Sequence, residues 1–302
     1  MQEWISFAKT TNAGSQLPRH SFFLVSPDAK RWCNSMFSNN IRNLPVFQGN
    51  RSAICDDRGR MQGLLDIYNL DSDRFLCILD GVDNEWFLNR FNMYMILDDI
   101  EQEELQEELF HICGPSAPDV LQGSGFTLPP EGKHYTKDND IHICKKNRFG
   151  IDGFDLITEN IDQLKAQLQQ NGLNDIPIEG FDALRILHGK AQWPQDGTNK
   201  TMIHELNLNE ECCSFNKGCY IGQEIINRID VKGLINKKIQ RVAIEGSVTL
   251  NDSLTLEGKV VGTVTSLTTV DQQQLGLSVL RKKAWEKGTR LLVSSGGIAT
   301  VL

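Results

Sequence analysis

The sequence contains no apolar run long enough to cross a membrane. No stretch reaches the roughly 18 uninterrupted apolar residues that a transmembrane helix needs. The first residues, Met1 to Trp4, lack the basic and apolar regions that are typical of a secretory signal peptide. We therefore expect a cytoplasmic protein that has no membrane partner.

The sequence also lacks the usual signatures of a metal site. No cysteine belongs to a C-x-x-C pair, and the histidines show no H-E-x-x-H spacing, so we predict no metal ligands. We interpret the adjacent pair Cys212 and Cys213 as a packing feature. A chain of this length does not need disulfide bonds for stability, so we expect reduced thiols at all eight cysteines, which are Cys33, Cys55, Cys77, Cys113, Cys144, Cys212, Cys213 and Cys219.

An excess of positive charge is absent as well. The 31 Lys and Arg residues stand against 39 Asp and Glu residues, which leaves a net charge of −8. A general surface for nucleic acid or for anionic lipid needs a positive field, so we expect no direct nucleic-acid partner. The 302 residues, 40% of them hydrophobic, are enough for about two or three globular domains.

The sequence pattern changes once along the chain. Residues 1–235 alternate between strand and helix patterns, which predicts an α+β body. Residues 236–302 contain short strands separated by glycines, as in a small antiparallel β-barrel domain. We expect the barrel strands at 240–245, 253–256, 260–266, 275–280 and 289–293.

An aromatic helix and an acidic run lie within the body. Residues 84–95 have aromatic and apolar side chains at nearly helical spacing, which predicts a helix with one aromatic face. Such a face packs into a core more often than it binds a ligand. The acidic residues in 98–108 predict a solvated sheet edge or helix face.

The segment from Phe215 to Glu224 concentrates residue types that carry chemistry. Gly218 and Gly222 permit backbone conformations that a Cβ would block, which suits a loop at a cavity. A helix is expected from Ile221 to Ile229, so Cys219 would lie just before a helix N-terminus and two residues from Lys217. Both neighbours favour a thiolate. On residue types alone, a small buried cysteine beside a solvated lysine fits the same segment equally well.

This segment resembles the K-G-C-Y-x-G-Q-E signature of the YgfZ family, which is related to the glycine-cleavage T-protein (GcvT). Three further segments resemble the family pattern: Asp56 to Asp66, Arg185 to Gly189, and Val260 to Ser266 followed by Gly276 and Leu277. The resemblance covers most of the chain. It implies a cloverleaf of subdomains around a central channel, with two interleaved subdomains in the body and the C-terminal barrel as the last.

The resemblance also implies a cofactor and partners. A tetrahydrofolate, or a derivative, would occupy the channel, and the protein would support assembly or repair of iron-sulfur enzymes, including tRNA-modifying ones. Its partners would be iron-sulfur client or assembly proteins. The implied catalytic residues are Cys219 and Lys217, and the implied cofactor-binding residues are Phe181, Arg185, Tyr220, Gln223, Glu224 and Arg228.

Two departures from the family patterns bear on activity. The T-protein acid aligns with Gly63 and Leu64, and neither has a carboxylate. The glutamate of the R-I-E-x-G segment, which would accept hydrogen bonds from the pterin, is replaced by Leu187. We therefore favour a YgfZ-type accessory protein over the alternative, a folate-dependent aminomethyltransferase or other one-carbon transferase. A purely structural partner-binding protein is a third hypothesis.

Overall fold

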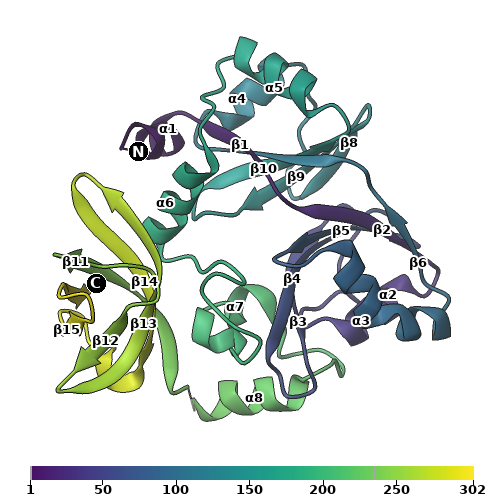
Figure 1. Cartoon of the computed structure of the whole chain (residues 1–302). Coiled ribbons are helices and arrows are strands. Elements are labelled where there is room, and N and C mark those ends of the chain that lie inside the picture. The colour runs from purple at the N-terminus through teal and green to yellow at the C-terminus, as the bar shows by residue number, and fades with distance from the viewer. Residues whose placement is uncertain (1, 234) are drawn as a thin grey trace.

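The computed structural model describes residues 2–233 and 235–302, and within them two five-stranded sheets and a closed six-stranded barrel surround a common centre (Figure 1). This arrangement confirms the predicted α+β fold with a C-terminal antiparallel barrel. None of the helices in the described part of the chain is long and apolar enough to span a membrane.

The first sheet has two helices on its outer face. Helices α4 (Ala117–Gly123) and α5 (Ile161–Gln170) pack their apolar residues against Phe110, Ile112 and Leu156 of the sheet. Asn160 is the N-cap residue of α5. The strand order is β1-β7-β10-β9-β8, with bounds β1 Ala13–Leu17, β7 Glu108–Cys113, β8 Tyr135–Asp138, β9 Ile141–Asn147 and β10 Asp152–Thr158.

The second sheet is covered in the same way by α2 (Ala29–Met36) and α3 (Asn84–Leu97). Helix α3 begins where the side chain of Asp83 accepts a hydrogen bond from the backbone N–H of Trp86 at 2.7 Å. The predicted acidic edge is confirmed as β6 (Glu101–Glu104), the last strand of this sheet. The strand order is β3-β4-β5-β2-β6, with bounds β2 His20–Val25, β3 Gly49–Cys55, β4 Met61–Asn69 and β5 Arg74–Asp80.

The chain weaves between the two sheets. Strand β1 belongs to the first sheet, β2 to β6 form the second, and β7 returns to the first beside β1. The inner faces of both sheets share a core with α1 (Gln2–Thr10) and α6 (Ile178–His188). Helix α1 and strand β1 were missed in the sequence, although Asn12 separates them and Pro18 directly follows β1.

The barrel begins at Lys237, and its strands follow the circular order β11-β14-β13-β12-β15-β16. Alternating apolar residues fill its interior, among them Val242, Leu254, Val264 and Leu291. The last strand, β16, was not predicted because its four residues follow a turn with two glycines at the end of the chain. The bounds are β11 Lys237–Glu245, β12 Ser253–Leu256, β13 Lys259–Val270, β14 Gln273–Arg281, β15 Arg290–Val293 and β16 Ile298–Val301.

Short helices link the body to the barrel. A 3-10 turn, η1 (Ile203–Leu206), and α7 (Asn209–Cys212) lead into the Phe215 to Glu224 segment, and α8 (Gln223–Lys232) follows it (Figure 1). Helix α8 therefore starts two residues later than the sequence predicted. Gly222, with a φ of 82°, is the residue that caps it.

Candidate functional site

Lys217 is anchored to the backbone of a neighbouring segment. Its Nζ donates hydrogen bonds to the carbonyl oxygens of Phe37 at 2.7 Å and Asn39 at 2.6 Å, and it lies 5.0 Å from the centre of the Tyr220 ring. Burial lowers the pKa of Lys217 to about 8. The lysine thus holds the loop on the body, and its contacts are with these carbonyls and this ring rather than with the Cys219 thiol.

Cys219 differs from every other cysteine of the chain by its exposure. It is exposed at the surface of the loop, whereas the seven remaining cysteines are buried free thiols. Burial raises the pKa of Cys33, Cys55 and Cys77. A reagent in solution can therefore reach Cys219 without any opening of the fold.

Two glycines fix the position of this loop. Gly222 has a φ of 82°, and a Cβ there would lie 2.5 Å from the carbonyl oxygen of Asp56 and 2.8 Å from the Cα of Gly59. Gly59 itself has a φ of 71°. The loop and the Asp56 to Gly59 turn, both noted in the sequence, are therefore packed backbone to backbone. A Cβ on Gly218 would meet no other atom within 4 Å, so packing does not require glycine there.

The residues that follow Gly222 serve the loop and the helix surface. The side-chain amide of Gln223 donates to the carbonyl oxygens of Lys217 at 3.3 Å and Gly218 at 3.4 Å, which closes the loop. Glu224 and Arg228 form an exposed ion pair of 2.9 Å one helical turn apart. Tyr220 is buried beneath the loop, and burial raises the pKa of its hydroxyl.

Phe181 lies apart from this loop, at a cavity between the first sheet and α6. Its ring stacks on Phe149 with centroids 4.6 Å apart and planes 13° apart. The cavity has a volume of about 300 Å³. Its wall includes Phe149, Phe181, Arg19, Glu179, Asp182 and Gln192.

Arg185 joins α6 to the barrel. The guanidinium is buried and pairs with Asp196 at 2.8 Å and with Asp182 at 2.5 Å. It also donates to the hydroxyl of Ser266 in β13 at 2.8 Å. Asp182, one partner of Arg185, lines the Phe181 cavity. Asp182 and Asp196 neutralise the charge of Arg185.

The structure places apolar side chains at the two positions where the related families have carboxylates. Leu64 is fully buried in β4, and a Cβ on Gly63 would meet the side chain of Val82. Leu187, near the end of α6, packs against two core clusters.

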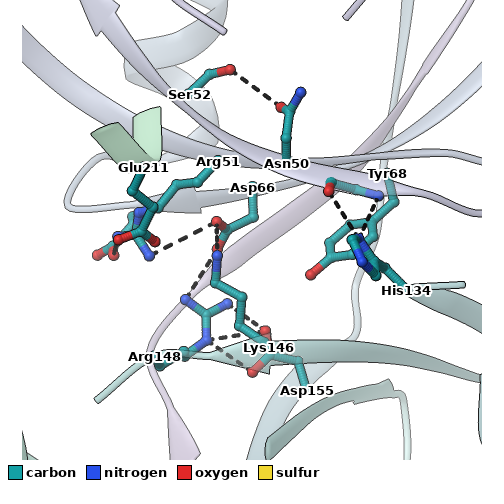
Figure 2. Close-up of polar contacts among 12 residues, drawn as sticks. Asn50, Arg51, Ser52, Asp66, Tyr68, His134, Lys146, Arg148, Asp155 and Glu211 are labelled. Atoms are coloured by element: carbon teal, nitrogen blue, oxygen red, sulfur yellow. Dashed lines mark hydrogen bonds and ion pairs between the residues drawn. The ribbon is translucent and has the colours of Figure 1, made fainter. Parts of the chain in front are cut away.

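A buried network of charged side chains lies between the two sheets, and the sequence analysis missed it. Asp66 in β4 binds Lys146 at 2.6 Å, Arg148 at 3.1 Å and Arg51 at 3.8 Å (Figure 2). Arg148 also binds Asp155 of β10 at 2.5 Å. Burial alone would raise the pKa of Asp66, but Lys146, Arg51 and Arg148 outweigh burial and hold that pKa well below its usual range.

Asp80 extends this network across the centre of the molecule. It pairs with Arg51 at 2.5 Å on one side and with Arg19 at 3.0 Å on the other. Arg19 lines the Phe181 cavity, and Arg51 lines a second cavity of about 550 Å³ together with Tyr68, His134, Lys145 and Lys190. The ion pairs of Asp80 therefore connect an arginine at one cavity to an arginine at the other. Charged residues inside apolar strands were the sequence signal for this network.

The predicted site residues thus fall into three groups. Lys217, Cys219, Tyr220 and Gln223 meet in one loop, and Phe181 and Arg185 meet at the cavity beside α6. Glu224 and Arg228 point to the surface of α8.

Comparison with known proteins finds relatives of this chain both in sequence and in structure. No protein-family model matches the chain. An aminomethyltransferase of Staphylococcus carnosus is 22% identical over 282 residues, which is 88% of this chain and 78% of the relative. The glycine cleavage system aminomethyltransferase T of Bartonella henselae superposes with a TM-score of 0.88 at 16% identity, covering 100% of this chain and 87% of that protein. The fold is therefore that of the glycine-cleavage T-protein, and the two findings support the T-protein superfamily without singling out the YgfZ family within it.

Proposed function

We propose that this chain binds a tetrahydrofolate and acts as an accessory protein for iron-sulfur enzymes, as the YgfZ-like motif implies. Two features together favour this accessory role over aminomethyl transfer. The T-protein acid position holds Gly63 and Leu64, and the motif loop presents an exposed Cys219. Aminomethyl transfer loses its carboxylate, whereas a thiol at the surface is available to a protein partner.

The Phe181 cavity has the residue types that a reduced folate requires. The Phe149 ring, which is stacked on the fully buried Phe181, offers an apolar surface to a pterin, and the carboxylates of Glu179 and Asp182 can accept hydrogen bonds from its amino edge. The Nε of Arg19 is buried without a hydrogen-bond partner. A cavity of about 300 Å³ accommodates the ring system and leaves the tail outside. Tetrahydrofolate would supply a carrier for one-carbon groups.

Folate binding is testable by isothermal titration with tetrahydrofolate. We expect a dissociation constant in the micromolar range or weaker, which corresponds to about −8 kcal/mol or less in magnitude, because Leu187 provides no acceptor. Phe181→Leu should weaken binding by about tenfold through loss of ring stacking. Absence of binding to the wild type would remove the folate part of the proposal. Unchanged affinity in Leu187→Glu would show that this position does not face the ligand.

A second candidate is a folate-dependent aminomethyltransferase, and the comparisons favour it. Both the Staphylococcus carnosus relative and the Bartonella henselae structure are named aminomethyltransferases. For this chain to perform that transfer, another carboxylate would have to replace the missing acid. Asp66 and Asp80 lie in the same sheet, but both are engaged by buried cations.

The accessory role is tested in a strain that lacks the gene. The activities of several iron-sulfur enzymes and the content of thiolated tRNA bases should fall in the deletion strain and return with the wild-type gene. Cys219→Ala should fail to restore them, whereas Asn216→Ala, a change at an exposed position in the same loop, should restore them. Normal activities in the deletion strain would exclude the accessory role.

A further inference from the structure

The C-terminal half of helix α3 is apolar on both its inner and its outer face. Phe87, Phe91 and Met95 are buried against the second sheet. On the opposite side, Met93 is 75% exposed, Ile96 is 72% exposed and Leu97 is 78% exposed. A helix on a protein surface normally carries polar residues on the side that faces water, and an adjoining group of exposed apolar residues marks an interaction site.

The first half of α3 is connected to the motif loop through the turn between β3 and β4. Arg90 of α3 donates a hydrogen bond to the carbonyl oxygen of Cys55 at 3.0 Å. The next residue along the chain, Asp56, is the one whose carbonyl oxygen lies against Gly222. Trp86 of α3 and Ile221 of the loop also pack against the same core cluster. The turn between β3 and β4 therefore connects the start of α3 to the loop that carries Cys219.

The exposed face runs along the helix. Arg90, Met93 and Leu97 are separated by three and four residues, so they follow one side of the helix. A partner lying along this side would cover Met93, Ile96 and Leu97 and would reach toward the exposed thiol at its near end.

Apart from Arg90, which lies on the same side of the helix, the exposed charged residues around this face are acidic. Glu85, Asp99 and Glu101 are exposed at the two ends of α3, and Asp98 is partly exposed and paired with Arg31. A second copy of this chain would bring the same acidic groups against one another, in a molecule whose net charge is −8. Charge complementarity instead favours a different protein that has an apolar centre and a rim of Lys and Arg.

We propose that the outer face of α3, formed by Met93, Tyr94, Ile96 and Leu97, docks a protein partner with an apolar, basic-rimmed surface and so brings it beside Cys219. This inference rests on the proposed accessory function, because it assigns the surface through which the partner approaches the thiol. It does not depend on the folate cavity, which lies at α6.

The chemistry of the surface is tested with two synthetic helical peptides that have leucines on one face. One carries lysines on its other face, and the second carries glutamates. Fluorescence anisotropy should show the lysine peptide binding about tenfold more tightly than the glutamate peptide. Met93→Gln with Leu97→Gln should weaken binding of the lysine peptide about tenfold. Leu292→Gln, a control at a barrel residue that is 63% exposed, should not weaken it. Equal binding by both variants would overturn the proposal.

The role of the surface is tested in the deletion strain. Met93→Gln with Leu97→Gln should fail to restore the iron-sulfur enzyme activities, while its melting temperature and its tetrahydrofolate affinity match the wild type. Glu85→Lys with Glu101→Lys, which reverses charges at the rim, should fail in the same way without any change to an apolar residue.

The outcomes separate this proposal from the function on which it rests. If the deletion strain is normal, the accessory role fails. If the wild type restores activity and the α3 variants restore it equally, the accessory role stands and the docking surface is wrong. Sedimentation equilibrium that reveals a dimer of the wild type, lost in the Met93 and Leu97 variant, would assign the face to a second copy and would also overturn the proposal.

Discussion

Gly222→Ala should destabilise the protein, whereas Gly218→Ala should not. At Gly222 the φ of 82° costs a residue with a Cβ about 1 kcal/mol or more. The new Cβ would lie 2.5 Å from the carbonyl oxygen of Asp56 and 2.8 Å from the Cα of Gly59, so the backbone of the loop or of the turn must move, at a cost of about 1–3 kcal/mol. Together these give a loss of about 2–4 kcal/mol in the free energy of unfolding.

The matched variant isolates the cause. Gly218 lies four residues earlier in the same loop, has open space around its Cα and does not have a positive φ. Alanine there should change stability by less than about 1 kcal/mol, in the stabilising direction, because it restricts the unfolded chain. Urea denaturation of both variants measures the difference. If the two variants unfold within about 0.5 kcal/mol of each other, the loop does not pack on the turn as described.

Four further predictions concern the buried charges and the loop. Asp66→Asn should lower the free energy of unfolding by about 3–5 kcal/mol in urea denaturation, because it leaves buried cations unpaired. The control Glu103→Gln, at a partly exposed ion pair, should lower it by less than about 1 kcal/mol. Equal losses in the two variants would contradict the buried network. Burial would raise the pKa of Asp155, but Arg148 and His111 hold it at about 2. The stability that the ionised Asp155 contributes is complete above pH 4, the ordinary range of an aspartate, and is lost as the pH falls toward 2. Asp155→Asn should therefore reduce the fall in melting temperature between pH 4 and pH 2. Limited iodoacetamide treatment followed by peptide mass spectrometry should label Cys219 before any other cysteine, and earlier labelling of a buried thiol would refute the assigned exposure. Lys217→Met should cost about 1 kcal/mol or more in urea, since two backbone carbonyls lose their donor, and a neutral result would contradict an anchoring role.

Those parts of the fold that depend on neighbouring residues could be predicted from the sequence. Helix α3 was predicted from the spacing of its own residues, and the glycine-punctuated strands after residue 236 form a barrel through antiparallel pairing of sequence neighbours such as β13 and β14. Strand β1 escaped prediction because its partner, β7, lies about a hundred residues further along the chain.

The site was harder to predict because it depends on register and on exact helix ends. Asp66, Arg51 and Asp155 share a network only because two sheets face each other, and no spacing in the sequence reveals that. Helix α8 starts at Gln223, two residues later than expected. Glu224 and Arg228 pair on the solvent side of that helix.

Lys217 and Cys219 lie two residues apart in the motif loop. The resemblance singled out Cys219 and Lys217 together, and the structure assigns them different surroundings. Lys217 holds the loop on the carbonyls of Phe37 and Asn39, and Cys219 lies free at the surface. The lysine thus positions the loop, and its amine is not the partner of the thiol.

We infer that this protein, with its T-protein fold, holds a folate without performing aminomethyl transfer. The most direct measurement combines the purified protein with the other components of a glycine-cleavage system, tetrahydrofolate and glycine, and follows methylenetetrahydrofolate, with an authentic T-protein as the positive control. The account predicts folate binding by titration and product no higher than in the sample without either protein. Robust product formation by this chain would contradict it and would establish the aminomethyltransferase.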